Sequence, residues 1–93
     1  MSMAEEQSYE EMIQILNNFV KNTQENCNVM IQAAQDCVDN TEEDDSVVAL
    51  NLTMKAKVNI IENNFETINE IIAALEQEIE KIRKANQEAK MDD

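Results

Sequence analysis

The second half of the chain carries a regular repeat of apolar residues. Between residues 58 and 82 these residues are spaced alternately three and four positions apart, and no polar residue occupies any of the repeat positions. They are Val58, Ile61, Phe65, Ile68, Ile72, Leu75, Ile79 and Ile82. This is the heptad pattern of a helix that packs against other helices along one apolar seam. Val47, Leu50 and Met54 extend the pattern backwards, so the sequence predicts a helix over about residues 46–90.

The first half carries a broader and less regular apolar stripe. Its central members are Tyr9, Met12, Leu16, Phe19, Thr23, Cys27, Met30, Ala34 and Cys37. Ile13, Val20, Ile31 and Val38 flank them. Ser8 and Glu11 stand at the spacing of a capping box, in which each side chain satisfies a backbone donor of the first turn. These features predict a helix over about residues 8–39.

A polar segment separates the two stripes. Residues 39–46 contain no apolar side chain, and Asn40 is a residue type that accepts the left-handed conformation of a helix C-cap. Asp44, Asp45 and Ser46 are all suitable N-caps for the helix that follows. We therefore predict a turn at about residues 40–45. The fold class is all-α, with residues 1–93 forming one antiparallel helical hairpin.

The two stripes are wider than one neighbouring helix covers, because further apolar residues such as Ile71 lie beside each seam. Isoleucine at both seam positions favours assemblies of more than two helices. We expect the hairpin to pair into a four-helix bundle, with itself or with another helical protein. The expected protein-interface residues are Met12, Leu16, Phe19, Met30, Val58, Ile61, Phe65, Ile68, Ile71, Ile72, Leu75, Ile79 and Ile82.

Composition narrows the possible functions. The 93 residues include no His, Gly, Pro or Trp, and their net charge is −13. Without His and Gly, the chain has neither a His-dependent catalytic centre nor a glycine-rich phosphate loop. The acidic balance disfavours nucleic acid and anionic lipid. We expect no catalytic residue, no cofactor and no membrane insertion, and a protein as the partner.

Three features could carry chemistry but have simpler explanations. Cys27 and Cys37 lie on the first stripe and are expected to be buried, reduced thiols, since about 15 Å of helix separates them. The acidic residues 42–45 lack the spacing and the glycine of a calcium loop, so no metal site is expected. Glutamates 62, 66 and 70 form either a solvated ridge or a docking strip for a basic surface.

The chain contains no apolar run long enough to span a bilayer, and its first residues lack the pattern of a cleaved signal peptide. We expect a cytoplasmic protein, or one exported by a route that needs no cleaved signal.

An acidic chain of this length with a turn near its middle resembles the WXG superfamily of bacterial type VII secretion. The resemblance covers the whole chain but rests on architecture. The family's Trp-X-Gly turn is replaced here by residues 41–46, and its C-terminal export motif, an aromatic followed by an acid, is absent from residues 82–87. The resemblance implies a targeting or chaperone-like partner of a motif-bearing relative or of a toxin's helical N-terminal domain.

Two other functions remain open at the level of sequence. The heptad seam alone would suit a coiled-coil adaptor or structural subunit of a cytosolic complex. The first 46 residues hold eleven acids against Lys21, which would suit an antitoxin-type inhibitor of a basic protein.

Overall fold

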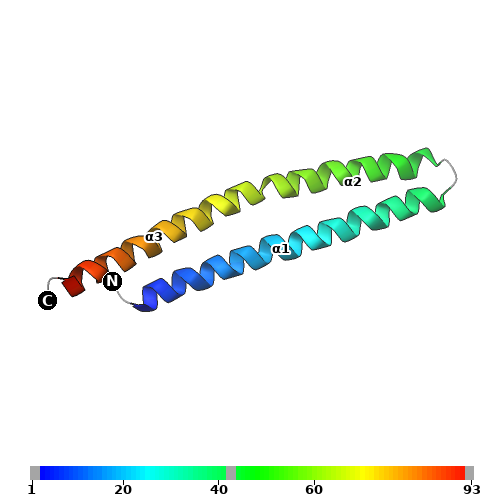
Figure 1. The fold of residues 1–93 in the computed structure, drawn as a ribbon. Helices are drawn as coiled ribbons and strands as arrows, with labels where there is room; N and C mark the ends of the chain where they lie inside the picture. Colours follow the sequence, from blue (N-terminus) through cyan, green and yellow to red (C-terminus); the bar gives the residue numbers. More distant parts are fainter. Residues whose placement is uncertain (1–2, 42–43, 92–93) are drawn as a thin grey trace. The chain divides into compact units, whose positions relative to one another are not determined.

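The computed structural model describes residues 3–41 and 44–91 (Figure 1). These residues form three helices, α1 (Met3–Asn40), α2 (Asp45–Asn63) and α3 (Phe65–Met91), and no strand occurs among them. The chain is all-α, and the helices before and after the turn form an antiparallel hairpin, as the sequence predicted.

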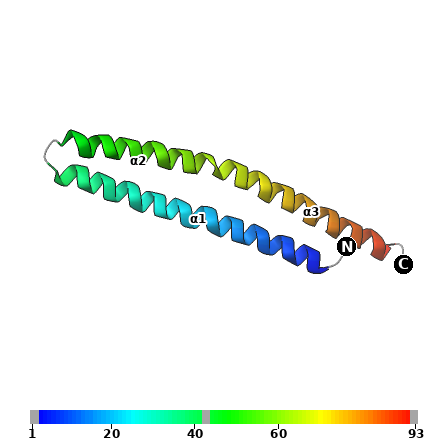
Figure 2. The same ribbon diagram turned by 180° about the vertical axis from the view of Figure 1, so that it is seen from behind.

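The chain divides into two compact units. Unit 1 consists of Met1–Phe19 and Thr67–Asp93, and unit 2 consists of Val20–Glu66. In unit 1 the first half of α1 lies beside α3, and in unit 2 the second half of α1 lies beside α2 (Figures 1 and 2). Each unit is therefore an antiparallel pair of helical segments with its own core.

Helix α1 begins at Met3 and not at Ser8, so Ser8 lies inside the helix and does not cap it. Residues 3–7 are mostly good helix formers, and Glu5 and Glu6 place negative charge in the first turn, where the helix dipole favours it. Glu6 is also held by an ion pair with Arg83 of α3. These interactions extend the helix past the capping box that the sequence suggested.

The second predicted helix is interrupted once. Asn64 keeps a right-handed helical conformation, with φ −73° and ψ −15°, but its backbone N–H bonds to the carbonyl of Ile61 at 3.1 Å. This bond spans three residues where an α-helix spans four, so one tighter turn separates α2 from α3. The heptad pattern of the sequence continues across Asn64 and therefore did not predict this interruption.

The core of unit 1 is formed by α3 against the first half of α1. Ile72, Ile79 and Ile82 are buried, and Ile82 is fully inaccessible. Ile13 and Leu16 of α1 are half-buried. The regular repeat of the sequence thus supplies the interior of this unit, as expected of an apolar seam.

The core of unit 2 is smaller and includes one polar residue. Cys27 of α1 and Val58 and Asn51 of α2 are its buried side chains. The sequence placed Leu50 in the apolar seam, but Leu50 is exposed and Asn51 takes that position. The prediction was wrong because seven-residue spacing from Val58 leads back to Asn51, and only the apolar character of Leu50 favoured the neighbouring register.

The turn begins where α1 ends at Asn40, and α2 begins at Asp45. Asp44 has an extended backbone and its carboxylate accepts a hydrogen bond from the Ser46 N–H at 2.9 Å, which makes it the N-cap. Thr41 donates its side-chain hydroxyl to the Cys37 carbonyl. Asn40 is still helical, so the expected left-handed cap there is not formed. Residues 42 and 43 of the predicted acidic turn lie outside the described part.

Candidate functional site

Unit 1 presents an apolar strip on α1. Met12, Ile15 and Phe19 follow one another at spacings of three and four, which places them on one side of the helix, and all three are exposed. Ile13 and Leu16 are half-buried on the inner side of α1. The predicted stripe was therefore right for Tyr9 and Leu16, which are half-buried, and wrong for Met12 and Phe19, which are exposed. The strip Met12, Ile15 and Phe19 is left for another surface.

The same unit contains a cluster of charges between α1 and α3. The Arg83 Nε donates to the Glu6 carboxylate at 2.5 Å, and its Nη2 donates to the Glu10 carboxylate at 2.9 Å. The hydrogen bond with Glu6 is the largest of the effects that raise the pKa of Arg83 above its ordinary value. Arg83 links α3 to the first turns of α1.

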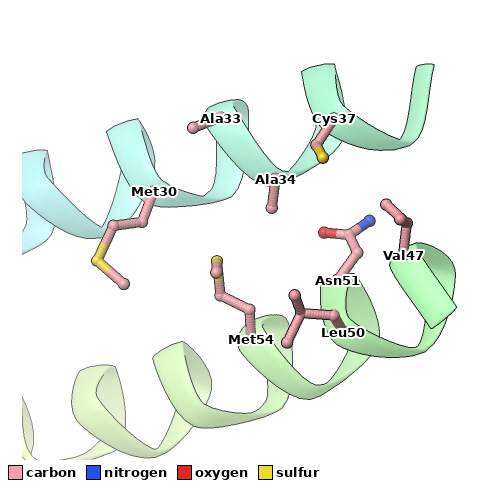
Figure 3. A pocket seen from close by; sticks show the side chains of 8 residues that line it. All are labelled: Met30, Ala33, Ala34, Cys37, Val47, Leu50, Asn51 and Met54. Carbon is pink, nitrogen blue, oxygen red and sulfur yellow. The ribbon is translucent and has the colours of Figure 1, made fainter. Parts of the chain in front are cut away.

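Unit 2 contains an open apolar pocket of about 310 Å³ between α1 and α2. Figure 3 shows its lining, in which Ala34 and Cys37 of α1 and Asn51 and Met54 of α2 are directed toward the space between the helices. The lining residues are Met30, Ala33, Ala34, Cys37, Val47, Leu50, Asn51 and Met54. The small side chains of Ala33 and Ala34 leave the space that the larger residues of α2 do not fill.

Asn51 is the polar group of this pocket. It is 7% exposed, and its Oδ1 is buried with no hydrogen-bond partner. In Figure 3 its carboxamide points from α2 toward Ala34 and Cys37. A buried acceptor without a donor costs free energy, so a ligand that brings a donor into the pocket gains by satisfying it. The sequence interpretation missed Asn51, although the seven-residue repeat contained the signal.

The sequence-predicted interface residues occupy three environments. Val58, Ile72, Ile79 and Ile82 are buried within the units. Leu16, Phe65, Ile68 and Leu75 are half-buried. Met12, Phe19, Met30, Ile61 and Ile71 are exposed. The exposed group is accessible to another protein, and contact of any of these residues with a partner stays a prediction.

The two cysteines differ from expectation in one respect. Cys27 is buried as predicted, but Cys37 is exposed at the pocket, and both are free thiols. Of the glutamates on the predicted ridge, Glu62 is half-buried while Glu66 and Glu70 are exposed.

The described residues also limit other kinds of site. Within residues 3–41 and 44–91, no three or more Cys, Asp and Glu side chains gather in a way that could hold a metal ion. Over the same residues, no helix has the length and apolar character needed to span a bilayer. The exposed apolar side chains of the hairpin suggest a protein partner.

Comparison with known proteins assigns no relative, since no family model, no curated protein and no solved structure matches the chain.

Proposed function

We propose that the chain is a non-catalytic protein-binding module, acting as a WXG-like partner or targeting protein for a type VII secretion substrate. The observation that carries this proposal is the apolar strip Met12, Ile15 and Phe19 of unit 1, which remains exposed among the residues that the structure describes. Apolar side chains grouped on one helix face are a common mark of a protein-binding surface. A partner helix that lays its own apolar face on the strip removes both surfaces from water.

Charge supports a basic partner for this strip. The first turns of the same helix hold four glutamates, of which Glu6 and Glu10 share the single charge of Arg83, and the whole chain carries a charge of −13. Opposite charge on a partner speeds the encounter and orients it, while the apolar contacts hold the complex. The preferred partner is therefore a helical protein domain that surrounds an apolar strip with Lys and Arg.

The resemblance to the WXG superfamily supports the secretion role. The hairpin architecture agrees with it, and residues 41–46 lack the Trp-X-Gly motif. A chain of this kind without the motif fits the role of companion to a motif-bearing relative or to a toxin's helical N-terminal domain. This proposal accounts for the exposed strip without requiring any catalytic group.

Affinity capture from the native host tests the proposal. The tagged chain, its Phe19→Glu variant and its Asn17→Glu variant are compared by quantitative mass spectrometry. Phe19 is 54% exposed, so its replacement leaves the core intact. Asn17 is also exposed but lies about 200° away around α1, which makes it a matched control for the added charge.

The expected result is recovery of a WXG-type relative or a helical toxin domain with the original chain and with Asn17→Glu, and its loss with Phe19→Glu. Recovery of a stable cytosolic complex in place of a secretion substrate would favour the adaptor function. Recovery that is equal for all three chains would show that the strip is not the binding surface.

A further inference from the structure

The pocket of unit 2 contains an unsatisfied hydrogen-bond acceptor. Among residues 3–41 and 44–91, one buried side-chain oxygen or nitrogen lacks a hydrogen-bond partner, and it is Oδ1 of Asn51. Asn51 is 7% exposed, and the other seven residues that line the pocket are apolar. A buried acceptor is rarely left unpaired in a folded protein, because it has given up its hydrogen bonds to water. The pocket is therefore complementary to an apolar group that supplies one donor.

The acceptor can be reached while the two helices stay packed. In Figure 3 the oxygen of the Asn51 carboxamide lies on the side of Ala34 and Met54, and its nitrogen lies on the side of Val47. Met30 and Met54 border the same space, and their unbranched thioether side chains change rotamer readily. An entering group therefore displaces flexible side chains and leaves the pairing of α1 with α2 intact.

The lining selects the chemistry of the entering group. A Lys or Arg side chain would lose the hydration of its charge in these apolar surroundings. Asn, Gln and Tyr side chains each bring an acceptor of their own, and Ser and Thr are too small to fill about 310 Å³. Indole is mostly apolar and has a single N–H donor and no acceptor. A Trp side chain therefore fits both the apolar lining and the one unpaired oxygen.

The Trp has to come from a different protein, because this chain contains none. Met30 and Leu50 are 46% and 63% exposed and extend the apolar surface beyond the pocket, so a polypeptide buries more of it than a free indole would. Residues 38–46 join the two lining segments and include five acids and no base. Charge therefore favours basic residues on either side of the Trp.

From these observations we propose that the pocket of unit 2 binds a Trp side chain of a partner protein, flanked there by basic residues, with the indole N–H donating to Oδ1 of Asn51. The inference rests on the proposed function in taking the partner to be a basic helical protein. It adds a contact on unit 2 to the apolar strip of unit 1.

Two synthetic peptides test the proposal on the purified chain. One is a helical peptide of Ala and Lys with a central Trp, and the other carries 1-methyltryptophan, in which a methyl group replaces the N–H hydrogen. Because the chain has no Trp, the indole fluorescence comes from the peptide alone. We expect a blue shift on binding, a Kd below about 1 mM, and at least about fivefold weaker binding of the methylated peptide. No binding at about 1 mM, or equal binding of the two peptides, would overturn the inference.

Asn51→Leu tests the hydrogen bond itself, after cooperative melting of the variant has been checked. Leu is close to Asn in size and has no acceptor, so the methylated peptide should now bind at least as well as the Trp peptide. Comparing two peptides on one variant cancels any general effect of the substitution on the fold. A fivefold preference for the Trp peptide that persists in Asn51→Leu would show that the bulk of the methyl group causes it, and would refute the contact.

Two Ala→Leu substitutions test the position of the site. Ala34 is directed into the pocket, whereas Ala49 is exposed on α2 and is not part of the lining. Ala34→Leu should weaken binding of the Trp peptide at least about fivefold, because the added methyl groups occupy the space that the ring needs. Ala49→Leu should change it less than about twofold. Equal effects of the two variants would overturn the assignment of the pocket.

Capture from the native host separates this inference from the proposed function. Capture that depends on Phe19, together with no binding of the Trp peptide, would leave the proposed function standing and overturn this inference. Peptide binding that depends on Asn51, together with no Phe19-dependent capture, would support this inference and refute the proposed function.

Discussion

Ile71 and Ile72 are consecutive residues of α3 in very different environments. Ile72 is 8% exposed and lies in the core of unit 1, whereas Ile71 is 45% exposed. Successive residues of a helix point about 100° apart, so only one of the two faces α1. The sequence analysis predicted both residues to lie at a protein interface. In the structure Ile72 is instead part of the core, and only Ile71 is accessible to another protein.

This pair provides a stability test with an internal control. We expect Ile72→Ala to lower the free energy of unfolding by about 2–4 kcal/mol, because it removes buried methyl groups and leaves a cavity. Ile71→Ala should lower it by less than about 1 kcal/mol. Urea denaturation followed by circular dichroism measures both. Similar losses for the two variants would mean that Ile71 is covered to the same extent in solution, for example by another chain.

Asn51 shows what a residue pattern reveals and what it conceals. The seven-residue repeat that runs through Val58, Phe65, Ile72 and Ile79 reaches Asn51 when it is extended backwards. Hydrophobicity alone favours Leu50 as the buried residue. In the packing of α1 against α2, however, Asn51 is buried and Leu50 is exposed. Buried polar residues are the positions at which apolar patterns fail, and they are also the positions most informative about binding.

At the level of the helix, the N-terminus of α2 depends on Asp44. Its carboxylate bonds to the Ser46 N–H, and its carbonyl accepts from the N–H groups of Val47 and Val48 at 3.1 Å. Asp44→Ala should lower the free energy of unfolding by about 0.5–2 kcal/mol, since the helix loses its cap. Thermal melts of this variant and of Asp45→Ala measure the difference, and Asp45→Ala should have the smaller effect. The reverse order would assign the cap to Asp45.

Much of the helical architecture followed from periodicity. The two stripes, the turn between them and Asp44 as one of three candidate caps were all available in the sequence. The start of α1 at Met3 was not, and neither was the ion pair between Glu6 and Arg83, which are far apart in the sequence. The tighter turn at Asn64 was also hidden, since a one-residue change in hydrogen bonding leaves the side-chain repeat intact.

The candidate site was only partly predictable for the same reason. Met12, Phe19 and Met30 were expected to lie at an interface and are exposed. The pocket, however, arises from small residues of α1 opposite larger residues of α2, and such a mismatch depends on how the helices are aligned. Alignment between two segments is set by packing across both, which a repeat within one segment does not specify.

For the whole molecule, net charge sets the response to salt. The chain has twenty acidic and only seven basic side chains, so repulsion between carboxylates outweighs attraction overall. The ion pairs of Arg83 with Glu6 and Glu10 are a local exception. Raising NaCl from about 50 mM to about 500 mM should therefore raise the melting temperature, because screening weakens the larger, repulsive part. A scanning calorimeter measures the shift. A fall in melting temperature would show that a few attractive pairs outweigh the net charge.

The same argument separates two kinds of association. Salt should strengthen the binding of a second acidic copy and weaken the binding of a basic partner. Titrations at both salt concentrations therefore give opposite trends for self-association and for partner binding. Identical trends would mean that charge steers neither process.

The two thiols differ in exposure, so their reactivity can report how often the helices of unit 2 separate. Cys37 is exposed, whereas Cys27 is 3% exposed between α1 and α2. A thiol reagent should modify Cys37 rapidly and Cys27 only during excursions in which the helices of unit 2 separate. The slow rate then reports how often this unit opens, and no engineered probe is needed. Peptide mapping assigns each rate to its residue, and modification of both thiols at one rate would mean that unit 2 exchanges quickly between closed and open forms.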